Sequence, residues 1–192
     1  MTHRQKIVNS ARTLFSRQGF SATGLRQIAE KAGVSLGNIY NHFRNKDELF
    51  EELLDPKALI ETLSGTFREI TEDFPFNIDR LILAVKKSVD SNRDLFKLIF
   101  IDLSEFEGRH TDRMMRYFIG TGKERFSRQL ESKSRTGKLK DLDYEFFIKL
   151  FIISSMSFFA SSHILPSLKI DRYSDEEVAK MLSGFILTGI RR

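Results

Sequence analysis

The chain of 192 residues has no cysteine, no tryptophan and only three prolines. Without cysteine it can form no disulfide, no thiolate metal site and no cysteine nucleophile, a composition that suits a reducing compartment. The segment from Met1 to Arg12 is polar and basic and lacks the apolar stretch of a secretory signal peptide. We therefore expect a cytoplasmic protein.

Residue patterns typical of enzymes are also missing. The four histidines (His3, His42, His110 and His163) form neither an HExxH motif nor a pair four residues apart. No glycine-rich phosphate loop and no GxSxG motif occurs. An enzyme is the rival interpretation from another functional class, but the sequence offers it no catalytic residues. We expect no catalytic site, no metal site and no cofactor.

Hydrophobic periodicity of the helical kind runs through most of the chain, and no segment sustains the alternation of a strand. The patterns predict an all-α protein of about nine helices, in which a three-helix domain over residues 1–46 precedes a larger helical domain over residues 47–192. The helix that starts at Lys46 is expected to be interrupted or kinked at Pro56, because proline has no N–H to bond the carbonyl four residues back.

The most informative segment is residues 25–49, which read as two short helices joined by a tight turn. The first helix has one apolar stripe, formed by Leu25, Ile28, Ala29 and Ala32. Gly33 ends that helix, because a residue without Cβ readily adopts the left-handed conformation of a C-cap. Ser35 can then cap the next helix with its hydroxyl. The segment is therefore a predicted helix-turn-helix.

The second helix of this motif, expected over residues 36–43, has two different faces. At 100° per residue, Ile39 and Phe43 share an inward face, and the outward face carries Gly37, Asn38, Asn41 and His42. In DNA-binding proteins of this kind the second helix enters the major groove, where asparagine can bond adenine with both amide atoms. The alternative is a helical hairpin whose polar face only meets water.

Charge is distributed unequally along the chain. Residues 1–46 contain eight lysines and arginines but only one acidic residue, Glu30, which gives them a net charge of +7. The whole chain has a net charge of +5, so the other 146 residues are slightly acidic. A face that only meets water needs no such asymmetry, whereas a surface that neutralises DNA phosphates does.

The run TGLRQIAEKAGVSLGNIYNHFRNKDELF, residues 23–50, resembles the N-terminal domain of the TetR (tetracycline-repressor) family of one-component bacterial transcription regulators. The similarity starts at Ile7 and fades after about Leu54. The resemblance implies a set of DNA-binding residues, namely Thr23, Arg26, Ser35, Leu36, Gly37, Asn38, Tyr40, Asn41, His42 and Lys46.

Within that set, the resemblance implies different roles. Leu36, Gly37, Asn38 and Asn41 would face bases, and Arg26 would reach a base or a phosphate. Phosphates would be held by Thr23, Tyr40, His42 and Lys46. Leu36 departs from the polar residue often found at its position in the family, so base preference there stays open.

Residues 146–165 are almost entirely apolar, with Lys149 and His163 as the only side chains that can carry charge. A membrane span is one interpretation, but five serines dilute the apolarity and no positive-inside asymmetry flanks the segment. We expect instead no membrane association and a homodimer in which two helices of each subunit, about 143–165 and 174–190, form a four-helix bundle. Its expected contact residues are Ile153, Met156, Ala160, Val178, Leu182 and Phe185. The last helix is expected to start with a capping box of Ser174 and Glu177.

Eighteen phenylalanines and four tyrosines are the remaining clue. Many lie on the central helices, where the resemblance implies a small-molecule pocket. Its candidate lining residues are Phe67, Ile70, Phe96, Phe100, Met114, Tyr117, Phe118, Phe147 and Phe151. They favour an apolar or aromatic effector, whereas Asp102, Glu105 and Glu107 would favour a cation unless they are solvated.

Together these observations predict a repressor that an apolar or aromatic ligand releases from a palindromic operator in double-stranded DNA. The alternative is a DNA-binding protein controlled by a protein partner without a small-molecule ligand.

Overall fold

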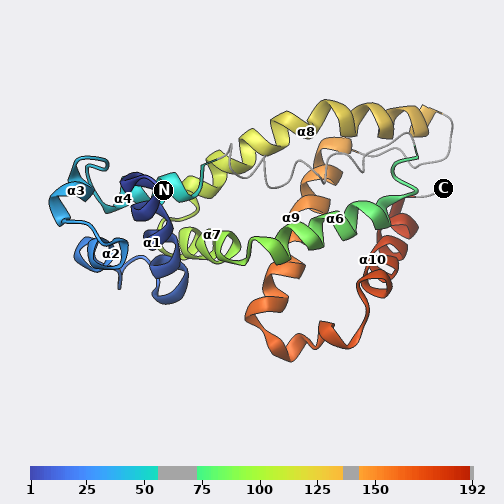
Figure 1. The fold of residues 1–192 in the computed structure, drawn as a ribbon. Coiled ribbons are helices and arrows are strands. Elements are labelled where there is room, and N and C mark those ends of the chain that lie inside the picture. Colours follow the sequence, from blue (N-terminus) through green and yellow to red (C-terminus); the bar gives the residue numbers. More distant parts are fainter. Residues whose placement is uncertain (56–72, 136–142, 191–192) are drawn as a thin grey trace. The chain divides into compact units, whose positions relative to one another are not determined.

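The computed structural model describes residues 1–55, 73–135 and 143–190, and in these ranges it contains helices and no strand, which confirms the all-α prediction. Figure 1 shows the helices in chain order. They are α1 (His3–Gln18), α2 (Leu25–Ala32), α3 (Leu36–Tyr40), α4 (Lys46–Leu53), α6 (Ile78–Ser91), α7 (Arg93–Glu105), α8 (Arg109–Arg135), α9 (Tyr144–Ile164) and α10 (Asp175–Ile190). Two short 3₁₀ helices, η1 (Pro166–Leu168) and η2 (Ile170–Arg172), connect α9 to α10.

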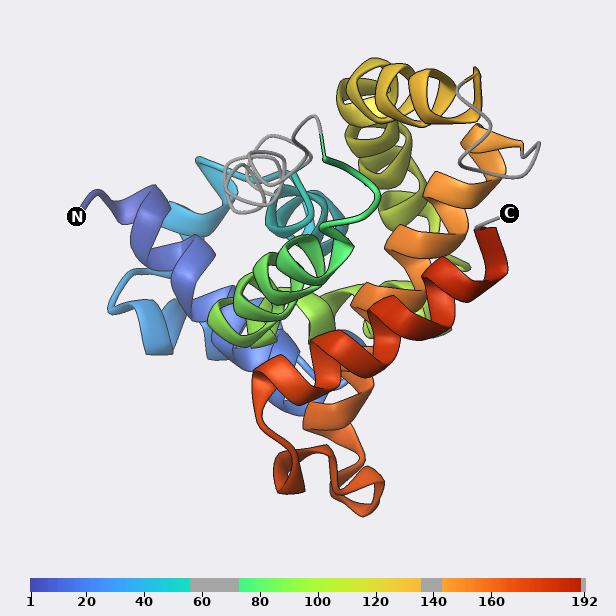
Figure 2. The same ribbon diagram turned by 90° about the vertical axis from the view of Figure 1, so that its right-hand side faces the viewer.

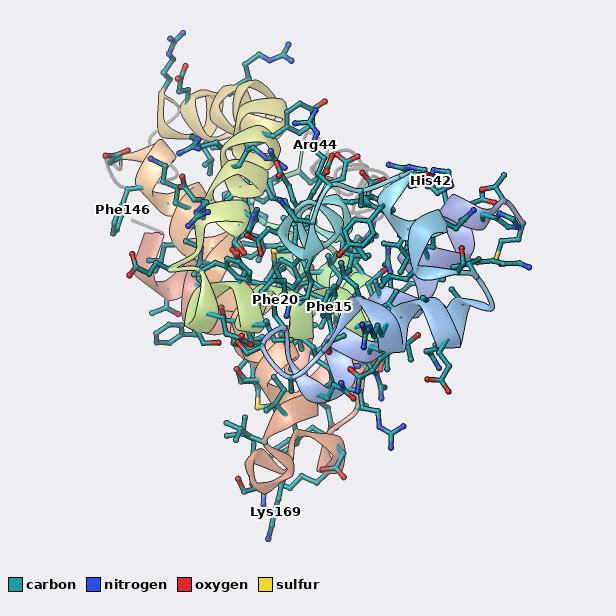
Figure 3. The ribbon with its side chains drawn as sticks, turned by 90° about the vertical axis from the view of Figure 1, so that its left-hand side faces the viewer. Phe15, Phe20, His42, Arg44, Phe146 and Lys169 are labelled. Atoms are coloured by element: carbon teal, nitrogen blue, oxygen red, sulfur yellow. The ribbon has the colours of Figure 1, made fainter. Side chains whose placement is uncertain are left out.

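One compact unit contains α1 to α4, α7 and the first part of α8. Helix α1 packs against α2, α3, α4 and α7. The core of this unit is apolar and fully buried. Its large side chains include Ile7, Phe15, Ile28, Ile39, Leu49 and Phe50. The rings of Phe15, Phe20 and Phe50 meet at centroid distances of 5.3 to 5.4 Å, and Figure 3 labels Phe15 and Phe20 in this unit. This core brings α7 into the same packed body as the helix-turn-helix, which the sequence boundary after residue 46 did not anticipate.

A second unit contains α6, α9 and α10, together with the later part of α8. Helix α6 packs against both α9 and α10 (Figure 2). Polar contacts join the same three helices: Lys86 Nζ of α6 forms an ion pair with Asp175 of α10 at 3.0 Å, and His163 Nε2 of α9 lies 2.8 Å from Asp90 of α6. In the part of the chain that the structure describes, α9 included, no helix is long and apolar enough to cross a membrane.

Helix ends follow the sequence signals in most places. The predicted capping box at the start of α10 is confirmed, because Ser174 Oγ accepts from the Glu177 N–H and Glu177 accepts from the Ser174 N–H. Helix α4 ends at Leu53, before Pro56, and the predicted continuation beyond that proline lies outside the described residues. Helix α3 ends at Tyr40, so the predicted extension to Phe43 is wrong. His42 and Phe43 instead form a turn whose N–H groups bond the Ile39 carbonyl.

Candidate DNA-binding surface

The turn between α2 and α3 has the geometry that the sequence predicts. Gly33 has φ +66° and ψ +37°, and its N–H bonds the carbonyls of Ala29 and Glu30. The N–H of Val34 bonds the Ala29 carbonyl at 3.0 Å. Ser35 is the N-cap of α3, and its hydroxyl accepts from the Asn38 N–H at 3.2 Å. A Cβ added at position 33 would meet no atom within 4 Å, but the positive φ would strain a residue other than glycine.

Helix α3 is anchored on one side and presented on the other. Ile39 and Phe43 are buried in the unit. Gly37, Tyr40, Asn41 and His42 are exposed, and Leu36 and Asn38 are half-buried. Figure 3 labels His42, which follows α3 in the first unit. A short rigid segment with a glycine and two exposed polar side chains is suited to lie against base edges in a major groove.

The two asparagines of this surface differ in their freedom to read bases. The Asn38 amide nitrogen lies 3.3 Å from His3 Nδ1, and its amide oxygen is buried and has no partner among the described residues. A contact through both amide atoms requires this side chain to rotate first. Asn41 is exposed and needs no such rotation. Asn41 is therefore the freer of the two side chains to bond a base.

Two residues predicted to contact phosphates, Thr23 and Lys46, form hydrogen bonds with the protein's own backbone in this structure. Thr23 is buried, and its hydroxyl donates to the Gly19 carbonyl at 2.7 Å. Lys46 Nζ donates to the carbonyls of Phe20 and Thr23, both at 2.9 Å, and lies 4.1 Å from the centre of the Phe20 ring. Carbonyls of the loop between α1 and α2 accept hydrogen bonds from both side chains. A resemblance carried over position by position does not reveal these hydrogen bonds. Both side chains therefore hold that loop in place.

Replacement of Lys46 by alanine should destabilise the fold by about 1 to 3 kcal/mol, because two carbonyls lose a charged donor and a ring loses a cation. DNA binding should weaken equally for all sequences, and its salt dependence should keep the same slope, because no phosphate contact is lost. Urea unfolding and DNA titrations at several salt concentrations measure both effects. Lys31→Ala, at an exposed lysine of α2, is the matched control, and an equal loss of stability there would contradict this role.

Arginines complete the charged part of the surface. Arg26 on α2 and Arg44 after α3 are exposed, and Figure 3 labels Arg44. Arg44 is not among the DNA-binding residues predicted from the sequence, although its position shortly after the second helix of the helix-turn-helix is a usable signal. Arg4 is engaged within the protein, because it lies 2.8 Å from Glu52 and 5.3 Å from the centre of the Phe43 ring. Arg26 and Arg44 are therefore the better candidates for phosphates.

Glu105, at the end of α7, contacts the same loop from another helix. Its carboxylate accepts from the N–H groups of Phe20 and Ser21, at 3.1 and 2.9 Å, and from the Ser21 hydroxyl. Desolvation alone would raise the pKa of this carboxyl group, but the hydrogen bonds from Ser21 and Phe20 outweigh it, and with the nearby Lys46 charge they lower the pKa. Glu105 is exposed, as its position at the end of a helix predicts, and it also accepts hydrogen bonds from the loop between α1 and α2.

Asp102, one turn earlier on α7, is completely buried. Its carboxylate accepts from His110 Nδ1 and from the Thr111 N–H, both at 2.7 Å, and so caps the start of α8. The His110 ring packs edge-on against Phe50 and Phe106. Burial acts to raise the pKa of Asp102, but the hydrogen bonds from Thr111 and His110 outweigh it, and the pKa is lowered. Asp102 therefore joins α7 to α8 and does not attract a cationic ligand.

The predicted ligand-pocket residues are divided between the two units. Phe96 and Met114 are buried and Phe100 is half-buried in the first unit. In the second, Phe151 is buried, Phe147 is half-buried and Tyr117 is exposed. Phe67 and Ile70 lie outside the described residues, and so does the side chain of Phe118. The pocket stays a prediction.

The predicted dimer residues also fall into two groups. Met156, Ala160 and Val178 are buried within the subunit itself and give no surface to a partner. Ile153 is 54% exposed, Phe185 is 82% exposed, and Leu182 is half-buried. Two exposed faces at helical spacing remain: the α9 face (Phe146, Leu150, Ile153, Ser154 and Ser157) and the α10 face (Met181, Gly184, Phe185, Thr188 and Gly189).

Comparisons with known proteins match the helix-turn-helix segment most strongly. The family model of bacterial regulatory proteins, tetR family, matches residues 7–53. The HTH-type transcriptional repressor KstR2 of Rhodococcus jostii is 30% identical over 92 residues, which cover 46% of this chain and 44% of that protein. The HTH-type transcriptional regulator HbdR of Aromatoleum sp. is 32% identical over 135 residues, 69% of this chain and 56% of that protein. The chain thus spans about half the length of these relatives.

Solved structures share the fold over nearly the whole chain. The fatty acid degradation regulator FadR from Bacillus halodurans aligns with a TM-score of 0.73 at 16% identity, over 98% of this chain and 96% of that one. The ketosteroid transcriptional regulator KstR2 of Mycobacterium tuberculosis aligns with a TM-score of 0.63 at 18% identity, over 100% of this chain and 96% of that one. These relatives and neighbours are transcription regulators and not enzymes.

Proposed function

Because the chain belongs to the tetR family of bacterial regulatory proteins, we propose that it is a cytoplasmic transcriptional repressor that binds a palindromic operator in double-stranded DNA as a homodimer. The observation that carries this proposal is the surface around α3. Gly37, Asn41 and His42 are exposed there, on a segment with a net charge of +7. Base-reading groups and phosphate-neutralising charge therefore lie on the same part of the chain.

Selection of bound duplexes from a random library tests this function. We expect enrichment of one palindromic site, and binding to that site should weaken steeply as salt rises, because cations are released when the basic segment meets phosphates. A protein that enriches no sequence, or binds all duplexes equally and independently of salt, would refute the proposal.

Asn41→Ala should weaken binding to the selected site by about 1 to 3 kcal/mol and relax preference at one base position in each half-site. Asn38→Ala should have a smaller effect, because the Asn38 amide oxygen is buried and its nitrogen faces His3. Titration of single-base variants of the site measures both. A larger loss for Asn38→Ala than for Asn41→Ala would contradict our assignment of the base-reading residue.

Two features support a dimer that uses the α9 and α10 faces. Both faces consist of exposed apolar or small side chains, over about three turns of α9 and about two and a half turns of α10. The all-helical fold also resembles that of solved regulators over nearly the whole chain. Four such faces from two subunits would bury one another in a four-helix bundle. This arrangement would place two α3 segments about 34 to 36 Å apart, one turn of duplex DNA.

For control of the repressor we favour release by a small apolar or aromatic ligand. The abundance of phenylalanine supports this choice. Two neighbours in fold are a ketosteroid transcriptional regulator and a fatty acid degradation regulator, and ketosteroids and fatty acids are largely apolar compounds. An apolar compound that binds should weaken operator binding, and the operator should weaken the compound's binding by the same factor. Equal affinity of the compound for free and operator-bound protein would favour the alternative, control by a protein partner.

A further inference from the structure

We propose that Glu105 is a positioning residue for DNA binding, which fixes the loop between α1 and α2 and thereby the start of α2. This inference rests on the proposed function. Glu105 touches no DNA in this account, because its carboxylate faces the loop backbone. Its role is to hold the surface that does.

The loop is held from two sides by opposite charges. Glu105 of α7 accepts from the N–H groups of Phe20 and Ser21, while Lys46 of α4 donates to the carbonyls of Phe20 and Thr23. Backbone groups paired with ionised side chains form stronger hydrogen bonds than neutral pairs do. The path of residues 20–23 is therefore held by α4 and α7 as well as by contacts within the loop.

Gly19 permits the close approach of this carboxylate. Its φ is +87°, and a Cβ placed on it would lie 3.3 Å from Glu105 Oε1. Both the backbone conformation and the limited space favour glycine. The Thr23 hydroxyl adds a bond across the same loop to the Gly19 carbonyl. Four residues of the loop thus take part in one contact system with Glu105 and Lys46.

The loop leads directly into the DNA-binding helices. Gly24 is the N-cap of α2, and its N–H bonds the Gln27 side chain at 2.9 Å. Arg26 follows on the exposed side of α2, and α2 packs against α3. A change in the loop therefore shifts the start of α2 and, with it, the groups that meet DNA.

Glu105 also stands one turn after Asp102, which caps the start of α8. The last turn of α7 therefore bonds the start of α8 through the Asp102 carboxylate and the α1–α2 loop through the Glu105 carboxylate. Helix α8 continues to Arg135. A displacement at the start of α8 would reach the DNA-binding surface through these two side chains, without passing through α4.

Glu105→Ala and Glu105→Gln test this role against matched controls on the same helix. Asp94→Ala and Asp94→Asn remove the same charge from an exposed position at the other end of α7. Glu105→Ala should weaken binding of the selected duplex by about tenfold, and Glu105→Gln, which keeps an acceptor, by a smaller factor. The salt slope should stay that of the wild type, because no phosphate contact is removed.

Thermal melting separates positioning from a general loss of folding. Glu105→Ala should melt below Asp94→Ala, because it loses hydrogen bonds to an ionised side chain. Both variants should stay folded at the temperature of the DNA titrations, where only Glu105→Ala should lose affinity. Affinity within twofold of Asp94→Ala, or a loss that only follows the fraction of unfolded protein, would overturn the proposal.

Amide hydrogen exchange of the wild-type chain and the variants distinguishes a failure of the positioning role from a failure of the proposed DNA-binding function. Glu105→Ala, but not Asp94→Ala, should accelerate exchange at the N–H groups of Phe20 and Ser21. If the wild type binds no duplex selectively while this acceleration is seen, the proposed function fails and the loop contact stands. If the wild type binds DNA selectively and exchange at Phe20 and Ser21 is unchanged in Glu105→Ala, the positioning role fails and the function stands.

Discussion

Phe185→Asp should convert a dimeric protein into monomers that keep their helix content and bind the operator about 100-fold or more weakly. Phe185 is 82% exposed in the subunit, so a carboxylate there disturbs no internal packing. In the proposed bundle it would be a charge buried against a second apolar face, which is strongly unfavourable. A monomer also has only one α3 segment, so it loses the linked contact with the second half-site of the operator. Sedimentation at micromolar concentration and operator titration measure the two effects.

Leu168→Asp is the matched control for this substitution. Leu168 is also a large exposed apolar residue of the same unit, in η1, but it belongs to neither the α9 face nor the α10 face. It should leave the dimer intact. A wild type that sediments as a monomer, or equal dissociation by both variants, would show that the α10 face is not the interface.

Asp102→Asn should lower the free energy of unfolding by about 2 to 4 kcal/mol, because a buried carboxylate that accepts three N–H groups is replaced by a group with one acceptor and its own unpaired donors. The loss would include the cap of α8. Urea unfolding at pH 7 measures the change. Asp112→Asn, at an exposed position of α8, is the control and should change stability by less than about 0.5 kcal/mol.

The stabilisation that the Asp102 carboxylate contributes depends on pH in a defined direction. The pKa of Asp102 is lowered in the folded protein, so folding releases a proton from this group in the acid range. Its stabilisation is therefore fully present above the unfolded pKa, about 3.9, and is lost as pH falls through the lower folded pKa. The stability difference between wild type and Asp102→Asn should shrink as pH falls below about 4. A difference that stays constant across this range would show that the ionised carboxylate is not what stabilises the joint.

Local signals account for the parts of the structure that the sequence predicted. Gly33 and Ser35 determine the turn of the helix-turn-helix through their own backbone and hydroxyl groups, and Ser174 and Glu177 cap α10 across three residues. Ile39 faces inward as helical spacing requires, and Phe43 is buried as predicted although it lies in the turn after α3. Each of these features depends on residues within about one turn of one another, so a single sequence suffices to find it.

Contacts between distant segments account for what was missed. Glu105 and Ser21 are 84 positions apart, and Lys46 lies 26 positions from Phe20. No periodicity reports such pairs, so the hydrogen bonds of Glu105 and Lys46 with the α1–α2 loop could not be predicted from the sequence. The dimer helices show a related limit. Periodicity places Val178 and Phe185 on one stripe, but only the packing of α10 on α6 shows that Val178 is covered within the subunit and Phe185 is not.

Footprinting of the selected duplex by hydroxyl radicals tests the central claim most directly, because it reports where the protein lies on DNA. Our account predicts two equal protected regions, related by the symmetry of the site and about one helical turn apart at their centres, with Asn41→Ala reducing both alike. A single protected region, or uniform protection along the duplex, would contradict a dimer that presents two α3 segments to one operator.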